Sequence, residues 1–369
     1  AGLTTVKYTH WNHFKAASNY DYSYVSAKDG SGADWVEGNG DATGGNADDL
    51  FIEADPISTY QFKAGVHYNL GEAISFLSAI PVFGKTYENA ALWANFGVAQ
   101  KPPIFDQVIQ DWDAKMSSDP INENFTGFEF GLDVYSNDGT MAGNINFYSM
   151  TWGDRVQTKY VQNLDGDDDI IYLTGINQVH SGIETEFAWQ VAPIARIDIG
   201  IGFGNWTYTD NITGTYRDGD ADVEFGYAVK DLKVGDMPQT NLVAGLTLSP
   251  VEGLNIQALY RYYDRHFSDW DPGSREYDPA SEAPEPGVIF QAPSYGVLDL
   301  HANYVLPFEF NGITPQLYLH VFNALDEVYI QDAVNNSRYN GWASNGQAAD
   351  AEVYFGLPTR FNLGLQVNL

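Results

Sequence analysis

The sequence contains no cysteine and few basic residues, and both absences narrow what the protein can be. Without cysteine there is no disulfide framework, no thiol nucleophile and no thiolate metal site. Only 18 Lys and Arg residues stand against 49 Asp and Glu residues, which gives a formal net charge of -31. Because so much negative charge repels polyanions, we exclude nucleic acid as a partner.

Long apolar runs and helical periodicity are missing as well. A membrane-spanning helix needs roughly 18 consecutive apolar residues. Residues 73–83 come nearest to such a run, but they are too few and include Ser and Pro. The chain is nevertheless 44% hydrophobic and contains 24 Tyr, 21 Phe and 9 Trp. This composition excludes a helical membrane protein and leaves the apolar residues to be explained in another way.

Apolar and polar residues alternate with a period of two in many segments, which is typical of strands with two unlike faces. In the final segment, Phe361, Leu363, Leu365 and Val367 alternate with polar residues or glycine. Other clear examples are residues 60–68, 92–98, 128–134, 197–203, 242–248 and 298–302. The pattern predicts an all-β chain.

The connections between these segments are of two kinds, and the two kinds alternate along the chain. Short connections with turn-forming residues fall at 137–139, 192–193, 250–253 and 311–312. Long connections fall at 101–124, 156–178, 209–239, 268–294 and 326–357. An antiparallel meander with such different ends is typical of a transmembrane β-barrel. We therefore predict one domain over residues 1–369, a transmembrane antiparallel barrel wall of about 12 strands.

Strand length and the aromatic residues favour the same fold. A strand of about 11 residues, tilted by about 45°, spans the apolar band of an outer membrane. Aromatic residues gather where strands meet connections, in 146–152, 204–208 and 259–267, which suits an interfacial girdle. The alternative is a soluble β-sandwich or propeller, which predicts strands of about 5 or 6 residues and short turns at both ends.

Seven segments resemble, in order and spacing, the C-terminal barrel of TonB-dependent outer-membrane receptors, and they look most like the Bacteroidetes-type branch. The most specific of them is HVFNALDEVY at residues 320–329, together with the terminal strand that follows it. The seven segments are 122–136, 146–156, 177–187, 229–246, 295–304, 320–329 and 354–369.

The resemblance implies an active transporter in the bacterial outer membrane and not an enzyme. Such a receptor is a barrel of roughly 22 strands that a folded plug domain fills. The inner-membrane TonB-ExbB-ExbD complex drives it through the plug. The solute would be a scarce one, such as a ferric siderophore, a cobalamin-like compound or an oligosaccharide. Further partners are outer-membrane lipid and lipopolysaccharide, the outer-membrane assembly machinery and a surface or accessory lipoprotein.

This sequence departs from the family because it shows neither a plug domain nor an energy-coupling TonB box at its N-terminus. We therefore expect the chain to be the C-terminal part of a larger barrel. The alternative is a complete 12-strand barrel, either a passive pore or a structural protein. In that case the strand expected near residues 3–16 would pair with residues 360–369.

Candidate functional residues are sparse. Trp270, Tyr277, Tyr339 and Trp342 lie in long connections and could stack on a solute, although they could equally hold the loops together. The polar residues Glu184, Glu186, Arg196 and Asp198 are expected to face the barrel lumen. No residue is proposed as catalytic, because the histidine and acidic residues of 262–271 are ordinary at a barrel rim.

Two acidic runs, at 165–169 and 218–222, resemble calcium-binding loops. Neither run has the glutamate at position twelve that an EF-hand requires. Two interpretations of these runs therefore remain open: loops that bind Ca²⁺, and acidic loops that are only hydrated. No other cofactor or metal is expected.

The terminal strand also resembles the signal that the outer-membrane assembly machinery reads, through Asn362, Gly364, Val367 and Leu369. Leu369 stands where that signal usually has an aromatic residue. We expect Leu369→Asp to block assembly more than it alters transport, because it places a charge at the recognised end. Surface labelling of the variant tests this, and normal surface levels would contradict it.

Overall fold

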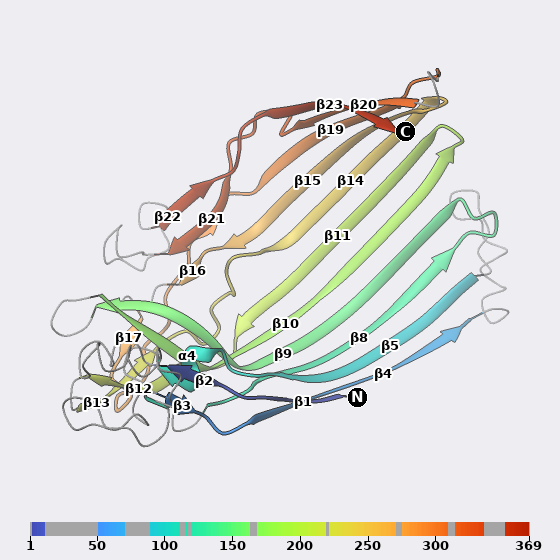
Figure 1. The fold of residues 1–369 in the computed structure, drawn as a ribbon. Coiled ribbons are helices and arrows are strands. Elements are labelled where there is room, and N and C mark those ends of the chain that lie inside the picture. Colours follow the sequence, from blue (N-terminus) through green and yellow to red (C-terminus); the bar gives the residue numbers. More distant parts are fainter. Residues whose placement is uncertain are drawn as a thin grey trace, which may run out of the picture.

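The computed structural model describes residues 2–11, 51–70, 89–110, 115–116, 120–162, 168–218, 221–270, 275–308, 314–335 and 351–368. Most of these residues lie in one 13-stranded sheet, here called the main sheet. Twelve of its strands form a continuous antiparallel path in chain order (Figure 1). They are β1 (Gly2–Val6), β4 (Ile57–Asn69), β5 (Asn89–Lys101), β8 (Glu123–Tyr135), β9 (Met141–Gln162), β10 (Asp168–Ala192), β11 (Ala195–Tyr208), β14 (Pro238–Val251), β15 (Leu254–Phe267), β19 (Tyr295–Val305), β20 (Thr314–Phe322) and β23 (Arg360–Asn368). The predicted all-β fold and its strand number are confirmed.

The strands of the main sheet are longer than those of a soluble sandwich. β4, β5 and β8 each have 13 residues, and β11, β14 and β15 each have 14. At a rise of about 3.3 Å per residue, such a strand is long enough to cross the apolar band of an outer membrane at a tilt. No helix of the described part of the chain is long and apolar enough to cross a membrane.

The two ends of the sheet differ, as the connection lengths predict. One end has tight turns, such as the turn after Ser136, where Gly139 has a positive φ of 70° and Asp138 Oδ1 accepts from Thr140 N. The long connections gather at the other end, at the lower left of Figure 1. We call this the long-loop end and the opposite one the short-turn end.

The long connections are more ordered than the sequence pattern predicts. The expectation of a loop over 156–178 is wrong, because β9 and β10 continue through most of it as a hairpin of 22 and 25 residues. In 209–239 and 268–294, β12 (Ile212–Asp218), β13 (Ala221–Tyr227) and β17 (Glu276–Tyr277) form a small sheet. The remaining short elements are β2 (Thr9–Trp11), β3 (Phe51–Glu53), α4 (Phe105–Val108), β6 (Ile109–Gln110), β7 (Lys115–Met116), β16 (Asp269–Trp270), β18 (Gln291–Ala292), β21 (Ile330–Asn335) and β22 (Ala351–Phe355). The alternation of apolar and polar residues does not predict these short strands, because each has too few residues for the pattern to repeat.

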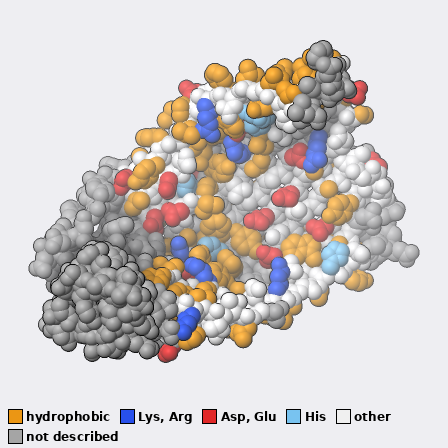
Figure 2. All heavy atoms as spheres, viewed as in Figure 1, with side chains coloured by type: hydrophobic (Ala, Val, Ile, Leu, Met, Phe, Trp, Pro, Cys, Tyr) orange, Lys and Arg blue, Asp and Glu red, His pale blue; other side chains and the backbone are white. Residues whose placement is uncertain are grey.

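The faces of the main sheet have opposite chemistry. The convex face is apolar: Phe128, Phe130 and Phe147 stack there in a row, with ring centroids 5.7 and 4.8 Å apart. Other exposed apolar residues on this face are Phe62, Val66, Leu92, Phe96, Ile145, Ile183, Phe203, Leu246, Leu300, Leu319, Phe361, Leu363 and Leu365. Figure 2 shows acidic and basic side chains spread over the hollowed face. A lipid-facing outside and a wet inside explain this division.

The largest set of buried apolar residues lies at the long-loop end and not inside the curve of the sheet. We call it the loop cluster; it consists of Leu173, Ile176, Tyr208, Ile212, Phe225, Tyr227, Val229, Leu232, Val234, Trp270 and Ile289. It joins the ends of β10 and β11 to the β12–β13 hairpin and to the residues that follow β15. The long connections therefore pack as a folded layer.

The main sheet is an open, curved wall in this structure. Among the described residues, β1 pairs with β4 and β23 pairs with β20, and the two outer strands do not pair with each other. Figure 1 shows them at opposite edges of the wall. In lipid, each unpaired backbone group along such an edge would cost several kcal/mol.

The orientation of the faces predicts opposite effects for two neighbouring substitutions in β9. Ile145 is exposed on the convex face, whereas Asn144 lies on the concave face and its Nδ2 donates to Glu186 Oε2. We expect Ile145→Arg to cost about 2–4 kcal/mol, because it places a charge in the apolar band. Asn144→Arg should be tolerated, because the longer side chain enters a wet space beside a carboxylate.

The measurement is the fraction of each variant that reaches the outer membrane in a protease-resistant, heat-modifiable form. Equal assembly of the two variants would contradict the assignment of the faces.

Candidate functional site

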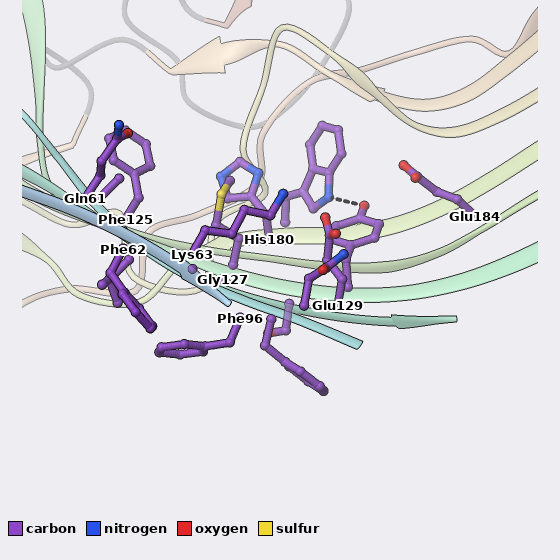
Figure 3. A pocket seen from close by; sticks show the side chains of 18 residues that line it. Gln61, Phe62, Lys63, Phe96, Phe125, Gly127, Glu129, His180 and Glu184 are labelled. Carbon is purple, nitrogen blue, oxygen red and sulfur yellow. Dashed lines mark hydrogen bonds between the residues drawn. The ribbon is translucent and has the colours of Figure 1, made fainter. Parts of the chain in front are cut away.

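A hollow of about 710 Å³ lies on the concave face toward the long-loop end. We call it the wall hollow. Alternate residues of six adjacent strands, from β4 to β11, give it its polar and aromatic lining: Gln61, Lys63, Asn95, Phe125, Glu129, Tyr148, Met150, His180, Glu184 and Trp206. Figure 3 shows Lys63, Glu129, His180 and Glu184 on one side of the strands, and Phe62 and Phe96 on the other.

Strand register brings these residues together from distant parts of the sequence. Gly97, Gly127, Met150, His180 and Trp206 are successive cross-strand partners along one row of the sheet. Gly97 and Gly127 have no side chain, so the concave surface is open over β5 and β8. The large side chains of His180 and Trp206 project from β10 and β11 beside this open space. The hollow follows from this difference in side-chain size.

The aromatic side of the hollow depends on two glycines. A Cβ atom at Gly182 would lie 2.6 Å from Tyr148 Oη, and one at Gly204 would lie 2.7 Å from Trp206 Nε1. Both rings therefore lie over backbone that only glycine leaves open. Trp206 Nε1 donates a hydrogen bond of 2.9 Å to Tyr148 Oη, which fixes the two rings relative to each other (Figure 3).

His180 extends this aromatic surface. Its ring centroid lies 5.2 Å from that of Trp206, at an interplanar angle of 32°. Its Nε2 lies 3.0 Å from Oε1 of the fully buried Gln178. Because an amide oxygen can only accept, Nε2 carries the proton and the amide holds the ring in place.

The chemistry of the hollow suits binding of a solute. Lys63 contributes a positive charge, and Glu129 and Glu184 contribute negative charges on the same face. Tyr148, His180 and Trp206 offer flat surfaces on which a planar or sugar-like group can stack.

The expected lumen residues lie on the concave face nearer the short-turn end. Glu184, Glu186, Arg196 and Asp198 line a second hollow there, of about 590 Å³. Arg196 Nη2 lies 2.7 Å from Asp198 Oδ1. Both side chains are exposed, so the ion pair contributes little to stability. The prediction that these four residues face the interior is confirmed.

The residues expected to contact solute are not brought together in the wall hollow. Trp270 is fully buried in the loop cluster, where its Nε1 donates to Tyr208 Oη over 3.1 Å. Tyr277 is half-buried in β17, and its ring covers Gly226. Tyr339 and Trp342 lie outside the described residues. For Trp270, the geometry is that of a residue that holds the loops together.

Burial raises the pKa of the Tyr208 hydroxyl well above its usual value, and the nearby charge of Asp269 raises the pKa further. A tyrosine hydroxyl is already neutral at physiological pH, so the higher pKa only extends the pH range in which Tyr208 stays uncharged. Its Oη accepts the hydrogen bond from Trp270 Nε1.

The other candidate residues have the following positions. Asn362 and Gly364 lie on the concave face of β23, opposite His320 and Tyr318, and Val367 is exposed on its convex face. Leu369 lies outside the described residues. Of the two acidic runs, residues 165–167 and 219–220 also lie outside them. No group of three or more His, Asp or Glu residues in the described part of the chain is arranged to hold a metal ion.

The prediction of an interfacial girdle in 146–152 and 204–208 does not hold for Tyr148 and Trp206. Both side chains line the wall hollow, and Trp206 is the cross-strand partner of His180, which Figure 3 shows on the concave side. The signal that could have placed them is parity: Trp206 is in phase with Asp198 of β11, and Tyr148 is in phase with the polar residues Asn144 and Asn146 of β9. Their meeting with His180 depends on cross-strand register, which the pattern does not show.

Comparison with known proteins finds similarity in structure only. No protein-family model matches the chain, and no curated protein sequence matches it. Among solved structures, the ferric-catecholate import receptor Fiu of E. coli K12 has a TM-score of 0.50 and 16% identity, over 89% of this chain and 37% of its own.

Two further structures have slightly higher TM-scores. The copper transporter OprC has a TM-score of 0.53 and 14% identity, over 88% of this chain and 41% of its own. A variant of the ferric enterobactin receptor PfeA of Pseudomonas aeruginosa has a TM-score of 0.52 and 14% identity. The match covers 85% of this chain and 41% of the PfeA chain. This chain thus spans about two fifths of the length of these proteins and shares their fold.

The buried position of Trp270 predicts a structural effect of its removal. We expect Trp270→Ala to destabilise the loop cluster by about 3–5 kcal/mol, as is usual when a buried aromatic side chain is truncated. Tyr208→Phe, the control, removes only the hydrogen-bond acceptor and should cost about 1 kcal/mol. Limited proteolysis of the assembled protein measures the difference, through cleavage of residues 209–237. Resistance of Trp270→Ala equal to that of the wild type would contradict the role of Trp270.

Proposed function

We propose that this chain is part of an outer-membrane active transporter of the TonB-dependent receptor kind, which imports a scarce solute into the periplasm. One observation carries the proposal: a long-stranded antiparallel wall has an apolar convex face, a polar concave face and most of its long connections at one end. The receptors and transporters named above share this fold over most of the chain. A bacterial outer membrane is the environment that such a wall fits.

The open sheet supports a larger barrel. β1 and β23 each have a free edge in the structure, and further strands along both edges would satisfy their backbone groups in lipid. The similar solved chains are more than twice as long as the part that this chain covers. We infer that residues 1–369 form the C-terminal part of a barrel of roughly 22 strands, of the Bacteroidetes-type branch, whose plug domain lies elsewhere in the protein.

The partners follow from this architecture. The TonB-ExbB-ExbD complex would act on the plug domain, and the assembly machinery on the strand that contains Asn362, Gly364 and Val367. Lipid would cover the convex face, and lipopolysaccharide and an accessory lipoprotein would meet the long-loop end.

The solute class is narrowed by the wall hollow. Three of its features favour a solute that combines a flat ring or sugar with polar groups: the paired rings of Tyr148 and Trp206, the His180 ring, and the mixed charges of Lys63 and Glu129. A ferric siderophore, a cobalamin-like compound and an oligosaccharide all have such groups. Two of the similar structures are named for ferric catecholate and ferric enterobactin, which favours the first of these.

The test is uptake of labelled ferric siderophores, cobalamin and oligosaccharides by cells with and without the gene, with and without TonB. We expect uptake of one class to require both genes. Uptake that needs this gene but not TonB would instead indicate a passive pore.

A single substitution and its control test whether the solute binds at the wall hollow. We expect Trp206→Ala to weaken solute capture by about tenfold or more, which is typical of a central aromatic anchor. Thr151→Ala is the matched control, because Thr151 is exposed, does not line the hollow and lies, by strand alternation, on the face opposite to Tyr148 and Met150. Equal capture by both variants, at equal surface levels, would exclude the hollow as the solute site.

A further inference from the structure

Two histidines face each other on the concave side of the main sheet, away from the wall hollow. His301 in β19 and His320 in β20 are direct cross-strand partners. Their Nδ1 atoms lie 2.9 Å apart, and their rings meet edge to face with centroids 5.0 Å apart. Both side chains are half-buried, and their strands reach them from the same short connection.

The geometry points to a metal site: we propose that His301 and His320 chelate one divalent transition-metal ion through their two Nδ1 atoms. Metal–imidazole bonds are about 2.0–2.1 Å long, so two nitrogens bound at a right angle lie about 2.9 Å apart. The observed separation equals that spacing. Imidazole suits Cu²⁺, Ni²⁺ and Zn²⁺, and Cu²⁺ binds most tightly of these to a given nitrogen site.

Without metal, the same contact is one hydrogen bond, in which one Nδ1–H donates to the other Nδ1. Metal binding needs both Nδ1 lone pairs. The donating ring must therefore transfer its proton to Nε2, a change of tautomer that leaves the charge of the ring unchanged. Both lone pairs must also turn from the line that joins the two nitrogens to a point beside it, which takes rotation of the rings but no movement of the strands.

The surroundings hold the pair in position but do not complete the coordination. The Phe322 ring lies 5.7 Å from the His301 ring and 6.1 Å from the His320 ring, and the Arg360 guanidinium lies over the same phenyl ring. Asp299, two residues before His301, is already occupied, because it pairs with Arg261 and accepts from Asn323 N.

Two protein ligands therefore leave positions open on the ion. Water, or donor atoms of a solute in the lumen, would fill them. The site requires only that the concave face is wet, so it does not rest on the proposed transport function.

The experiment uses the whole gene product, purified from outer membranes in detergent and freed of metal. Cu²⁺ is titrated and followed by electron paramagnetic resonance, whose nitrogen couplings distinguish imidazole ligands from the many carboxylates of this acidic chain. We expect one tight Cu²⁺ with two equivalent nitrogens. Only a large excess of Zn²⁺ should displace it, because Zn²⁺ binds such a site more weakly, and Ca²⁺ should not displace it, because Ca²⁺ prefers oxygen ligands.

Variants test which histidines bind. His301→Asn and His320→Asn should each weaken this Cu²⁺ by about tenfold or more, since even loss of an outer-shell partner costs that much. His67→Ala is the control: His67 is also on the concave face, but its cross-strand partner is Trp93. All variants are compared as assembled, heat-modifiable protein.

Cu²⁺ binding that is unchanged in both asparagine variants would overturn the site, as would a spectrum without two-nitrogen coupling in the wild type. Loss of solute uptake with intact Cu²⁺ binding, or the reverse, separates this proposal from the proposed function.

Discussion

The structure depends on one constraint, the pairing of every backbone N–H and C=O group in a region without water. An antiparallel ladder satisfies these groups between neighbours, and the main sheet extends this ladder unbroken through twelve strands. Because side chains alternate along each strand, the ladder also separates an apolar convex face from a polar concave face. In the described part of the chain, the outer strands β1 and β23 each have one edge of unpaired backbone groups. Further strands of a larger barrel would pair with these groups.

Since the inside of the curve is wet, apolar residues cannot form a core there. They gather instead at the long-loop end, where Tyr208, Trp270 and their neighbours bury one another. This cluster gives the long connections a fixed shape, and it begins at Tyr208, two residues along β11 from Trp206, which packs against it. A solute captured between the loops would therefore reach the wall hollow directly.

The concave face shows how a regular sheet makes sites. Glycines at 182 and 204 let Tyr148 and Trp206 lie along the wall, while glycines at 97 and 127 leave space opposite them. Cross-strand pairing does the same with different chemistry at His301 and His320, which meet Nδ1 to Nδ1. In both places, residues of neighbouring strands together form the site.

The sequence by itself determined the strands, their two faces and the two kinds of connection, because a period of two and turn residues are local properties. Residues such as Glu184 and Asp198 were correctly assigned to the interior from parity alone. The tertiary structure decided which residues meet. It buried Trp270, turned Tyr148 and Trp206 inward, and continued β9 and β10 through most of 156–178, because cross-strand register and loop packing join residues far apart in sequence. Periodicity gives the face of a residue, and only the register between strands gives its neighbour.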